Sequence, residues 1–306
     1  MTTLVFGHKS PDTDSTGSPI IWAWYLNEVK GVDAKPVLLG TPNTEAQFMV
    51  KRWGFEMPEI IEDVADGQAC VVVDTNNPAE LPANINGADV QAIIDHHKLV
   101  GGLETKGPID ITIRPLACTA TIMIDLMGDD AAKMPDNIKA AALTCILSDT
   151  LEFRSPTTTD HDRAVTEKLA ADLGINISEY ASEMFEAKSD VSAFSAAELC
   201  RLDSKVFEVS GTKFRVGVLE TTAPKMILDR KDELMASFED VAKEDELDQV
   251  LLFVVDILNE EATLFIPNDL VKTVAEKSFG ATVTGDTVVL PGIMSRKKQI
   301  IPNLAV

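Results

Sequence analysis

The sequence is poor in basic residues, in histidine and in long apolar runs. Its 27 lysines and arginines stand against 49 aspartates and glutamates, so the formal charge is -22 at pH 7. A surface with this charge repels nucleic acid and anionic membranes, which excludes both as general partners. An anionic substrate would need a local concentration of positive charge.

The chain also lacks an apolar run that could cross a membrane and a paired-cysteine motif. Val250 to Val255 is a typical run and falls far short of the roughly 20 residues that a membrane-spanning helix requires. No basic segment followed by an apolar one opens the sequence, so we expect a cytoplasmic protein. Without a C-x-x-C pair, the cysteines are predicted to be buried thiols. They are Cys70, Cys118, Cys145 and Cys200.

What the chain does have is a regular alternation of short apolar runs and longer helical patterns in its first half. That alternation is typical of an α/β fold with a doubly wound, mostly parallel sheet. The predicted strands are Leu4–Phe6, Pro36–Leu39, Ala69–Val73 and Val90–Ile94. The predicted helices are Ser18–Val29, Thr44–Trp53, Ala120–Met127, Asp136–Leu147 and Asp160–Leu173.

A second pattern begins near residue 192 and predicts a smaller domain with a mixed sheet. Two domains are expected for 306 residues, and we place them at 1–188 and 195–306, joined by 189–194. Helices are predicted at Ala196–Leu202 and over one long stretch, Lys225–Ala242. Strands are predicted at Lys205–Val209, Phe214–Leu219, Gln249–Asp256, Thr263–Ile266, Thr282–Val283 and Thr287–Leu290, with a short helix after the fourth of them.

The strongest local motif is the segment from Gly7 to Ser15, which lies between the first predicted strand and the first predicted helix. It carries His8, Asp12 and Asp14. Ligands in doubly wound sheets gather outside the carboxyl ends of the strands, which is where this loop is expected. Taken alone, the segment is explained equally well as a turn that caps the following helix.

Three more aspartates follow apolar segments in the same manner: Asp74, Asp95 and Asp149. Removing a carboxylate from water costs several kcal/mol unless it is paired or coordinated. Basic residues are scarce near these positions, so shared cations explain the group more simply than separate partners, although a cap or turn explains any one of them.

Histidine is concentrated in these segments. Of the four in the chain, His8, His96 and His97 lie beside the aspartates, whereas His161 reads as an exposed residue in a first helical turn. Imidazoles mixed with carboxylates, without thiolates, favour manganese, cobalt or iron. Two such ions held about 4 Å apart activate water and neutralise charge on a phosphoryl group. The pattern therefore predicts a hydrolase of phosphate linkages.

A basic segment near the C-terminus could supply the missing positive charge. It reads Ser295-Arg296-Lys297-Lys298-Gln299. An isolated run of this kind is usually a solvated surface, but an arginine fork and a lysine are also the usual means of binding phosphate oxygens. From spacing alone, Lys205 is a surface lysine.

Taken together, these motifs resemble the family II inorganic pyrophosphatases, the manganese-preferring branch of the DHH phosphoesterase superfamily. The resemblance extends over essentially the whole chain. The first motif and the Asp95-His96-His97 triplet are shared with the wider superfamily, whereas the C-terminal Ser-Arg-Lys-Lys-Gln segment is more specific to pyrophosphatases. The resemblance implies a DHH domain followed by a DHHA2-like domain.

The resemblance also implies roles for individual residues. One metal would be bound by His8, Asp12, Asp74 and Asp149, and the other by Asp14, Asp74, His96 and Asp149. His97 would act beside the substrate and Asp95 would orient a neighbouring histidine. Lys205, Ser295, Arg296 and Lys297 would form the substrate pocket.

As cofactors the resemblance implies two Mn²⁺ per subunit, with Co²⁺ or Mg²⁺ as substitutes, and a further Mg²⁺ brought with the substrate. The implied reaction is the hydrolysis of inorganic pyrophosphate to two orthophosphates by a metal-activated water, in a homodimer joined through the N-terminal domain. One departure is visible in the segment from Thr75 to Glu80, because familiar members have a histidine directly after the metal aspartate.

Two other functions compete with this one. A DHH phosphodiesterase acting on short oligonucleotides or a nucleoside bisphosphate would have the same metals, but its C-terminal domain usually carries a glycine-rich motif ending in histidine, which is not found here. A non-catalytic manganese- or phosphate-binding regulator would keep the fold, yet it has no need of two metals beside a phosphate clamp.

Overall fold

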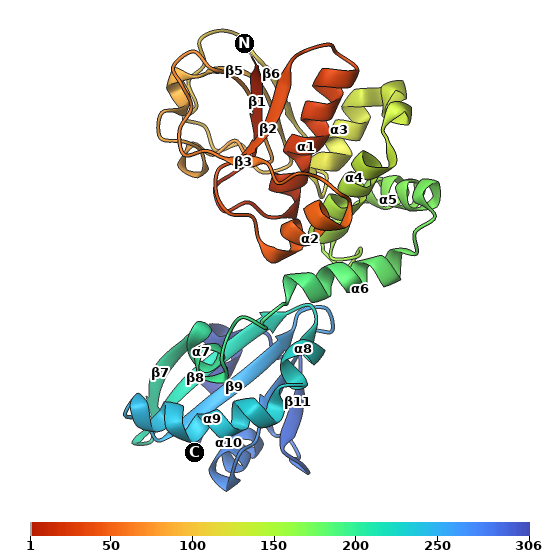
Figure 1. The fold of residues 1–306 in the computed structure, drawn as a ribbon. Helices are drawn as coiled ribbons and strands as arrows, with labels where there is room; N and C mark the ends of the chain where they lie inside the picture. The colour runs from red at the N-terminus through yellow and green to blue at the C-terminus, as the bar shows by residue number, and fades with distance from the viewer. Residues whose placement is uncertain (1) are drawn as a thin grey trace. The chain divides into compact units, whose positions relative to one another are not determined.

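The computed structural model describes residues 2–306, and the chain divides into two compact units, Met1–Ala187 and Lys188–Val306. Figure 1 shows the helices and strands of each unit. In chain order the first unit contains β1 (Thr3–Phe6), α1 (Thr13–Glu28), β2 (Ala34–Leu38), α2 (Thr44–Arg52), β3 (Glu59–Ile60), β4 (Ala69–Val73), β5 (Asp89–Asp95), β6 (Asp110–Ile113), α3 (Thr119–Met127), α4 (Asp136–Thr150), α5 (Asp160–Leu173) and α6 (Ile177–Lys188), which ends at the boundary.

The six strands of the first unit form one parallel sheet in the order β3-β2-β1-β4-β5-β6. Helices α1, α3 and α4 lie on one face of this sheet (Figure 1). All five residues of β4 are buried, as expected for a parallel strand covered on both faces. The strand order reverses between β1 and β4, and in such sheets the crevice at the carboxyl ends of these two strands is the usual binding site.

Close packing of α1 against α4 depends on one glycine. A Cβ atom added at Gly17 would lie 2.3 Å from the Sγ atom of Cys145, so a larger residue there would have to displace that buried thiol. Three of the six predicted metal ligands lie on these helices or directly before them: Asp12, Asp14 and Asp149. The contact between the helices therefore sets the spacing of these three side chains. The four cysteines are all buried and free, which confirms that prediction.

The predicted elements of the first unit are confirmed, and three others were missed. Helix α1 begins at Thr13 rather than Ser18 because the Asp12 side chain accepts the backbone N–H of Ser15 and caps the helix. Strand β3 has only two residues, and β6 is a half-exposed strand at the sheet edge with little apolar periodicity. Helix α6 was not predicted either.

The second unit contains α7 (Ala196–Leu202), β7 (Ser204–Val209), β8 (Thr212–Thr221), α8 (Pro224–Leu228), α9 (Lys231–Glu244), β9 (Gln249–Asp256), β10 (Glu261–Phe265), α10 (Asp269–Phe279) and β11 (Thr287–Pro291). Its five-stranded sheet has the order β11-β10-β9-β8-β7, with β8 and β9 parallel and the other pairs antiparallel. The predicted mixed sheet is confirmed.

Strand β9 separates two apolar cores in this unit. Side chains alternate across a strand, so Leu251, Phe253 and Val255 pack on one face with α10, whereas Val250, Leu252 and Val254 pack on the other with α7 and α9. This alternation makes all eight residues of β9 buried. Such a strand reads in sequence as a continuous apolar run.

Two predictions for the second unit are wrong. The single helix predicted over Lys225–Ala242 is interrupted at Asp229 and Arg230. The interruption arises because the guanidinium of Arg230 donates hydrogen bonds to the backbone carbonyls of Val191 and Phe194. Thr282–Val283 is not a strand. Val283 packs in an apolar core, and a residue can do so without pairing with a neighbouring strand.

No helix among residues 2–306 combines the length and apolar content needed to span a bilayer.

Candidate metal centre

The predicted ligands meet at the carboxyl edge of the parallel sheet. His8 follows β1, Asp74 follows β4, and Asp95 is the last residue of β5, directly before His96 and His97. Asp12 and Asp14 lie at the start of α1, and Asp149 lies in the last turn of α4. Four segments that are far apart in the chain thus converge where the strand order reverses.

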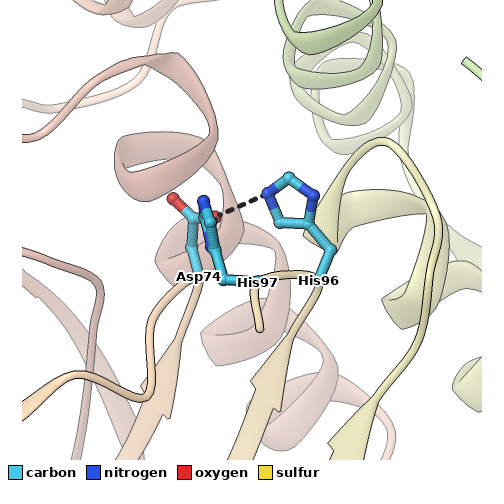
Figure 2. A group of neighbouring side chains, drawn as sticks. All are labelled: Asp74, His96 and His97. Carbon is cyan, nitrogen blue, oxygen red and sulfur yellow. Dashed lines mark ion pairs between the residues drawn. The ribbon is translucent and has the colours of Figure 1, made fainter. Parts of the chain in front are cut away.

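Asp74 occupies the middle of this group, and each of its two carboxylate oxygens faces a different histidine. Its Oδ2 atom lies 3.4 Å from His8 Nε2, and its Oδ1 atom lies 3.3 Å from His96 Nε2, as Figure 2 shows for the latter. Two ligands of one ion at bond lengths of about 2.1 Å are expected roughly 3.0–3.5 Å apart. Each Asp74 oxygen and its neighbouring histidine thus lie at the separation expected of two ligands of one cation.

Three overlapping groups of side chains offer ligand atoms that all lie within 4.8 Å of one another. The first is His8, Asp12 and Asp74; the second is Asp14, His96 and Asp149; the third is Asp74, His96 and His97. The six residues predicted as ligands are all members of the first two groups.

Both ligand histidines are oriented by their other ring nitrogen. His8 Nδ1 lies 2.7 Å from the carbonyl oxygen of Lys9, and His96 Nδ1 lies 3.2 Å from that of Leu116. A backbone carbonyl beside Nδ1 favours the tautomer with its proton there and leaves the Nε2 lone pair for a metal. In both rings that Nε2 atom is the one directed at Asp74.

The buried aspartates are supported by hydroxyl and amide donors. Asp14 accepts hydrogen bonds from Ser18 Oγ (2.7 Å) and from the backbone N–H of Thr119 (2.8 Å). Thr119 Oγ1 also lies 3.2 Å from Asp74 Oδ1. Ser18 and Thr119 were not predicted as site residues, because nothing in the spacing of a helix-start threonine connects it to aspartates 105 and 45 residues away.

His97 differs from the other histidines because it belongs to a hydrogen-bonded chain. Its Nδ1 atom lies 2.9 Å from Asp95 Oδ1, while Asp95 Oδ2 accepts from Asn76 Nδ2 at 2.5 Å. The Asp95 carboxylate raises the pKa of His97 despite partial burial. Burial alone would raise the pKa of Asp95, but its bonds to His97 and Asn76 lower it. About half of the His97 side chain is exposed.

The buried carboxylates of the centre repel one another, which favours the binding of cations between them. Burial, and then repulsion from Asp14, raise the pKa of both Asp74 and Asp149 well above its usual range. Burial lowers the pKa of His8, but Asp12 and the Lys9 carbonyl outweigh it and raise that pKa to about 9. Among the described residues, no lysine or arginine forms an ion pair with Asp14, Asp74 or Asp149.

One buried atom points to the same conclusion. Asp149 Oδ2 is inaccessible to solvent and has no hydrogen-bond partner within residues 2–306. A buried carboxylate oxygen without a partner is costly, and a divalent cation removes that cost. The donor set of imidazoles and carboxylates, without thiolates, fits manganese.

The remaining predicted residues gather in the second unit. Lys205, Ser295, Arg296 and Lys297 line one cavity of about 500 Å³. Arg296 is held there by Asp203, donating to its backbone oxygen at 2.6 Å and to its carboxylate at 2.7 Å. Lys205 and Lys297 form no ion pair with any residue that the structure describes. The cavity therefore presents two lysines without ion-pair partners, beside the carboxylates of Asp203 and Glu220 that also line it.

Comparison with known proteins identifies the family. Residues 2–150 match the DHH family, N-terminal domain, and residues 182–305 match the DHHA2 domain. A manganese-dependent inorganic pyrophosphatase of Methanocaldococcus jannaschii is 35% identical over 309 residues, covering 98% of this chain and 97% of its own. The chain belongs to the family II, manganese-dependent inorganic pyrophosphatases.

Other family members agree with this assignment. A Deinococcus radiodurans relative, whose name places it among the manganese-dependent inorganic pyrophosphatases, is 38% identical over 305 residues, covering 98% of this chain and 96% of its own. The crystal structure of a Methanococcus jannaschii family II pyrophosphatase superimposes with a TM-score of 0.62 at 34% identity, covering 99% of this chain and 98% of that one.

Within this family II member, the unusual segment after Asp74 has clear local contacts. Thr75 Oγ1 donates to Glu80 Oε2 at 2.6 Å. The side chain of Asn76 binds Asp95, the carbonyl of Lys98 (3.0 Å) and the N–H of Val100 (2.7 Å). Asn76 thus connects the loop after β4 to the loop after β5. The same segment lines a cavity of about 380 Å³ beside His8 and His97.

The glutamine at the end of the basic segment has a structural role. Gln299 Oε1 accepts the backbone N–H groups of Met294 and Ser295, both at 2.9 Å, and its Nε2 donates to the carbonyl of Gly292. Gln299 therefore holds the loop that presents Arg296 and Lys297 in a fixed shape. No separate role was predicted for Gln299 from the sequence.

Proposed function

We propose that this chain hydrolyses inorganic pyrophosphate to two orthophosphates with two manganese ions. One ion is assigned to His8, Asp12, Asp74 and Asp149, and the other to Asp14, Asp74, His96 and Asp149. Ions bound in this way lower the pKa of a water and offset charge that develops on the phosphoryl group. The observation that carries the proposal is the placement of the two Asp74 oxygens against two different histidines.

His97 is the proposed proton donor or hydrogen-bond donor to the substrate. Asp95 holds its Nδ1 atom and raises its pKa, so the protonated imidazole persists to higher pH than that of a free histidine. Its exposed edge is then available to a phosphate oxygen. Asp95 acts through His97, and Asn76 in turn holds Asp95.

The substrate's phosphates are assigned to the cavity of the second unit. Lys205, Arg296 and Lys297 provide the local positive charge that a chain of net charge -22 otherwise lacks. Because Arg296 is already held on two of its donors by Asp203, its remaining N–H groups are fixed in direction before a phosphate arrives.

The test of the proposed function is phosphate release from pyrophosphate and from a dinucleotide, measured with manganese and then with magnesium alone. We expect turnover of pyrophosphate with both metals, faster with manganese, and none of the dinucleotide. Turnover of the dinucleotide alone would identify a phosphodiesterase. Turnover of neither would identify a binding protein that has kept the fold.

Replacing Arg296 by alanine is expected to raise KM for pyrophosphate about 10- to 100-fold, because a charge-assisted pair of phosphate contacts is lost. Bound manganese should stay at the wild-type level, and so should stability, since Asp203 is exposed when it loses its partner. Steady-state kinetics and metal analysis measure both. Lys298→Ala removes a charge from the same segment outside the cavity and is the matched control. Equal KM in the two variants would contradict the assignment.

We also propose that the protein forms a homodimer through β6. This strand ends the parallel sheet, and Ile111 on it is 56% exposed. A free strand edge with an apolar side chain favours pairing with another strand.

Ile111→Lys is expected to yield a monomer in sedimentation velocity. Ile60→Lys is the matched control, because Ile60 is 48% exposed on β3 at the opposite sheet edge. Dissociation by Ile60→Lys alone would assign the interface to β3.

A further inference from the structure

One buried acid in the first unit has no part in the metal or substrate assignments. Glu45 lies in the first turn of α2 and has no accessible surface. Its Oε2 atom accepts a hydrogen bond from Thr13 Oγ1 at 2.9 Å and another from Ser148 Oγ at 2.7 Å. From the sequence alone, this glutamate is an acidic residue that stabilises a helix N-terminus. Nothing in its sequence position indicates a further role.

The two partners of Glu45 are immediate neighbours of proposed metal ligands. Thr13 stands between Asp12 and Asp14 in the chain, and Ser148 directly precedes Asp149. One carboxylate oxygen therefore connects the start of α1 to the last turn of α4, across 103 residues of sequence between Glu45 and Ser148. The connection spans the two elements that must keep these ligands at a fixed separation.

Helix α2 is itself fixed to the same loop. The side chain of Asn43 accepts the N–H of Ala46 and caps the helix, and the backbone N–H of Asn43 donates to the carbonyl of Pro11, next to Asp12. The thiol of Cys145 on α4 also lies 3.4 Å from the carbonyl of Thr13. Glu45 thus reaches Thr13 and Ser148 from a helix with little freedom to move.

A buried carboxylate costs several kcal/mol, and an apolar side chain of similar size would fill the space without that cost. The cost is consistent with a role in the site, because groups that orient metal ligands commonly affect metal affinity as much as activity. We propose that Glu45 is a positioning residue of the metal centre, holding Thr13 and Ser148 so that Asp12, Asp14 and Asp149 converge on the ions. This inference rests on the proposed two-metal function.

The experiment compares Glu45→Ala and Glu45→Gln with the wild-type enzyme. Manganese affinity is measured by electron paramagnetic resonance of the free ion, and the visible spectrum of the cobalt-loaded enzyme reports the coordination. Glu45→Ala is expected to weaken manganese binding about 10- to 100-fold and to change the cobalt spectrum. Glu45→Gln should bind manganese within about threefold of wild type, because its amide oxygen still accepts from both hydroxyls.

Thr144→Val is the matched control for stability. Thr144 is buried on the same helix as Ser148, one turn away, and its hydroxyl binds the Ala140 carbonyl and the Tyr180 hydroxyl instead of a neighbour of the ligands. It should lower the melting temperature without changing manganese affinity or the cobalt spectrum. If Glu45→Ala does not fold, Ser148→Ala replaces it, with a smaller loss of affinity expected.

The inference is overturned if the alanine variants bind manganese as tightly as Thr144→Val does, or if Glu45→Gln is as impaired as Glu45→Ala. Measuring the wild-type enzyme alongside separates the two levels of failure. A wild type that neither binds two manganese ions nor releases phosphate refutes the proposed function and this inference with it. A wild type that does both, with unaffected Glu45 variants, refutes this inference alone.

Discussion

Replacing Asp74 by asparagine is expected to lower kcat for pyrophosphate by about a thousandfold or more and to reduce the bound manganese. Each Asp74 oxygen faces a different histidine, and we propose that this carboxylate holds both ions. Asparagine offers one oxygen and turns an NH₂ group toward one of the Nε2 atoms. Loss of a residue that merely orients a ligand costs about 10- to 100-fold, and loss of a ligand shared by two ions should exceed that range.

Metal analysis after gel filtration and initial-rate kinetics at saturating manganese test this result. Asp66→Asn is the control, since it makes the same chemical change at a side chain that is 89% exposed in the same unit. The asparagine variant at Asp74 should stay folded, because it removes a repulsive charge from a cluster of buried carboxylates. Full activity in Asp74→Asn would show that Asp74 is not a bridging ligand.

Removing the metals is expected to destabilise the protein strongly, and more so at higher pH. At an ion concentration of about 100 times Kd, each ion adds roughly 2.7 kcal/mol to the free energy of unfolding. Two ions add roughly 5 kcal/mol, or about 10–20 °C in melting temperature for a domain of this size. Calorimetry with manganese and with a chelator measures the difference.

The pH dependence follows from the buried carboxylates. In the metal-free protein the folded-state pKa values of Asp74 and Asp149 are raised above that of a free aspartate, about 3.9. The folded state then binds more protons than the unfolded state, so stability falls as pH rises through this window. His8, with a folded-state pKa of about 9, stabilises the fold below its usual value of 6.5, and that contribution is lost as pH rises through 9.

Manganese replaces these protons, so its stabilising effect should be larger at pH 8 than at pH 5. The comparison needs only the shift in melting temperature between the chelated and the metal-loaded protein at each pH. An equal shift at both values would mean that ion binding displaces no protons from the aspartates. A variant lacking Asp149 should lose part of the pH dependence along with most of the shift, because Asp74 and His8 still titrate.

Much of the fold followed from local pattern. The buried strands β4 and β9 are continuous apolar runs, and Thr159 and Ser195 form the capping boxes that start α5 and α7. The elements that were not predicted correctly have a common cause. Strand β6 exists because β5 offers it a free edge, and the break between α8 and α9 depends on carbonyls more than thirty residues away. Neither influence is present in the local sequence.

The sequence by itself determined the chemical character of the site: carboxylates and imidazoles that follow buried segments, and a basic segment in an acidic chain. These are properties of residue type and of position at the end of a strand, which are local. Only the tertiary structure decided which atoms meet. It turned the two Asp74 oxygens to separate histidines, set Glu45 between Thr13 and Ser148, and paired Arg296 with Asp203. Those contacts join residues as many as a hundred positions apart, and their distances are set by how helices and strands pack, which no local pattern encodes.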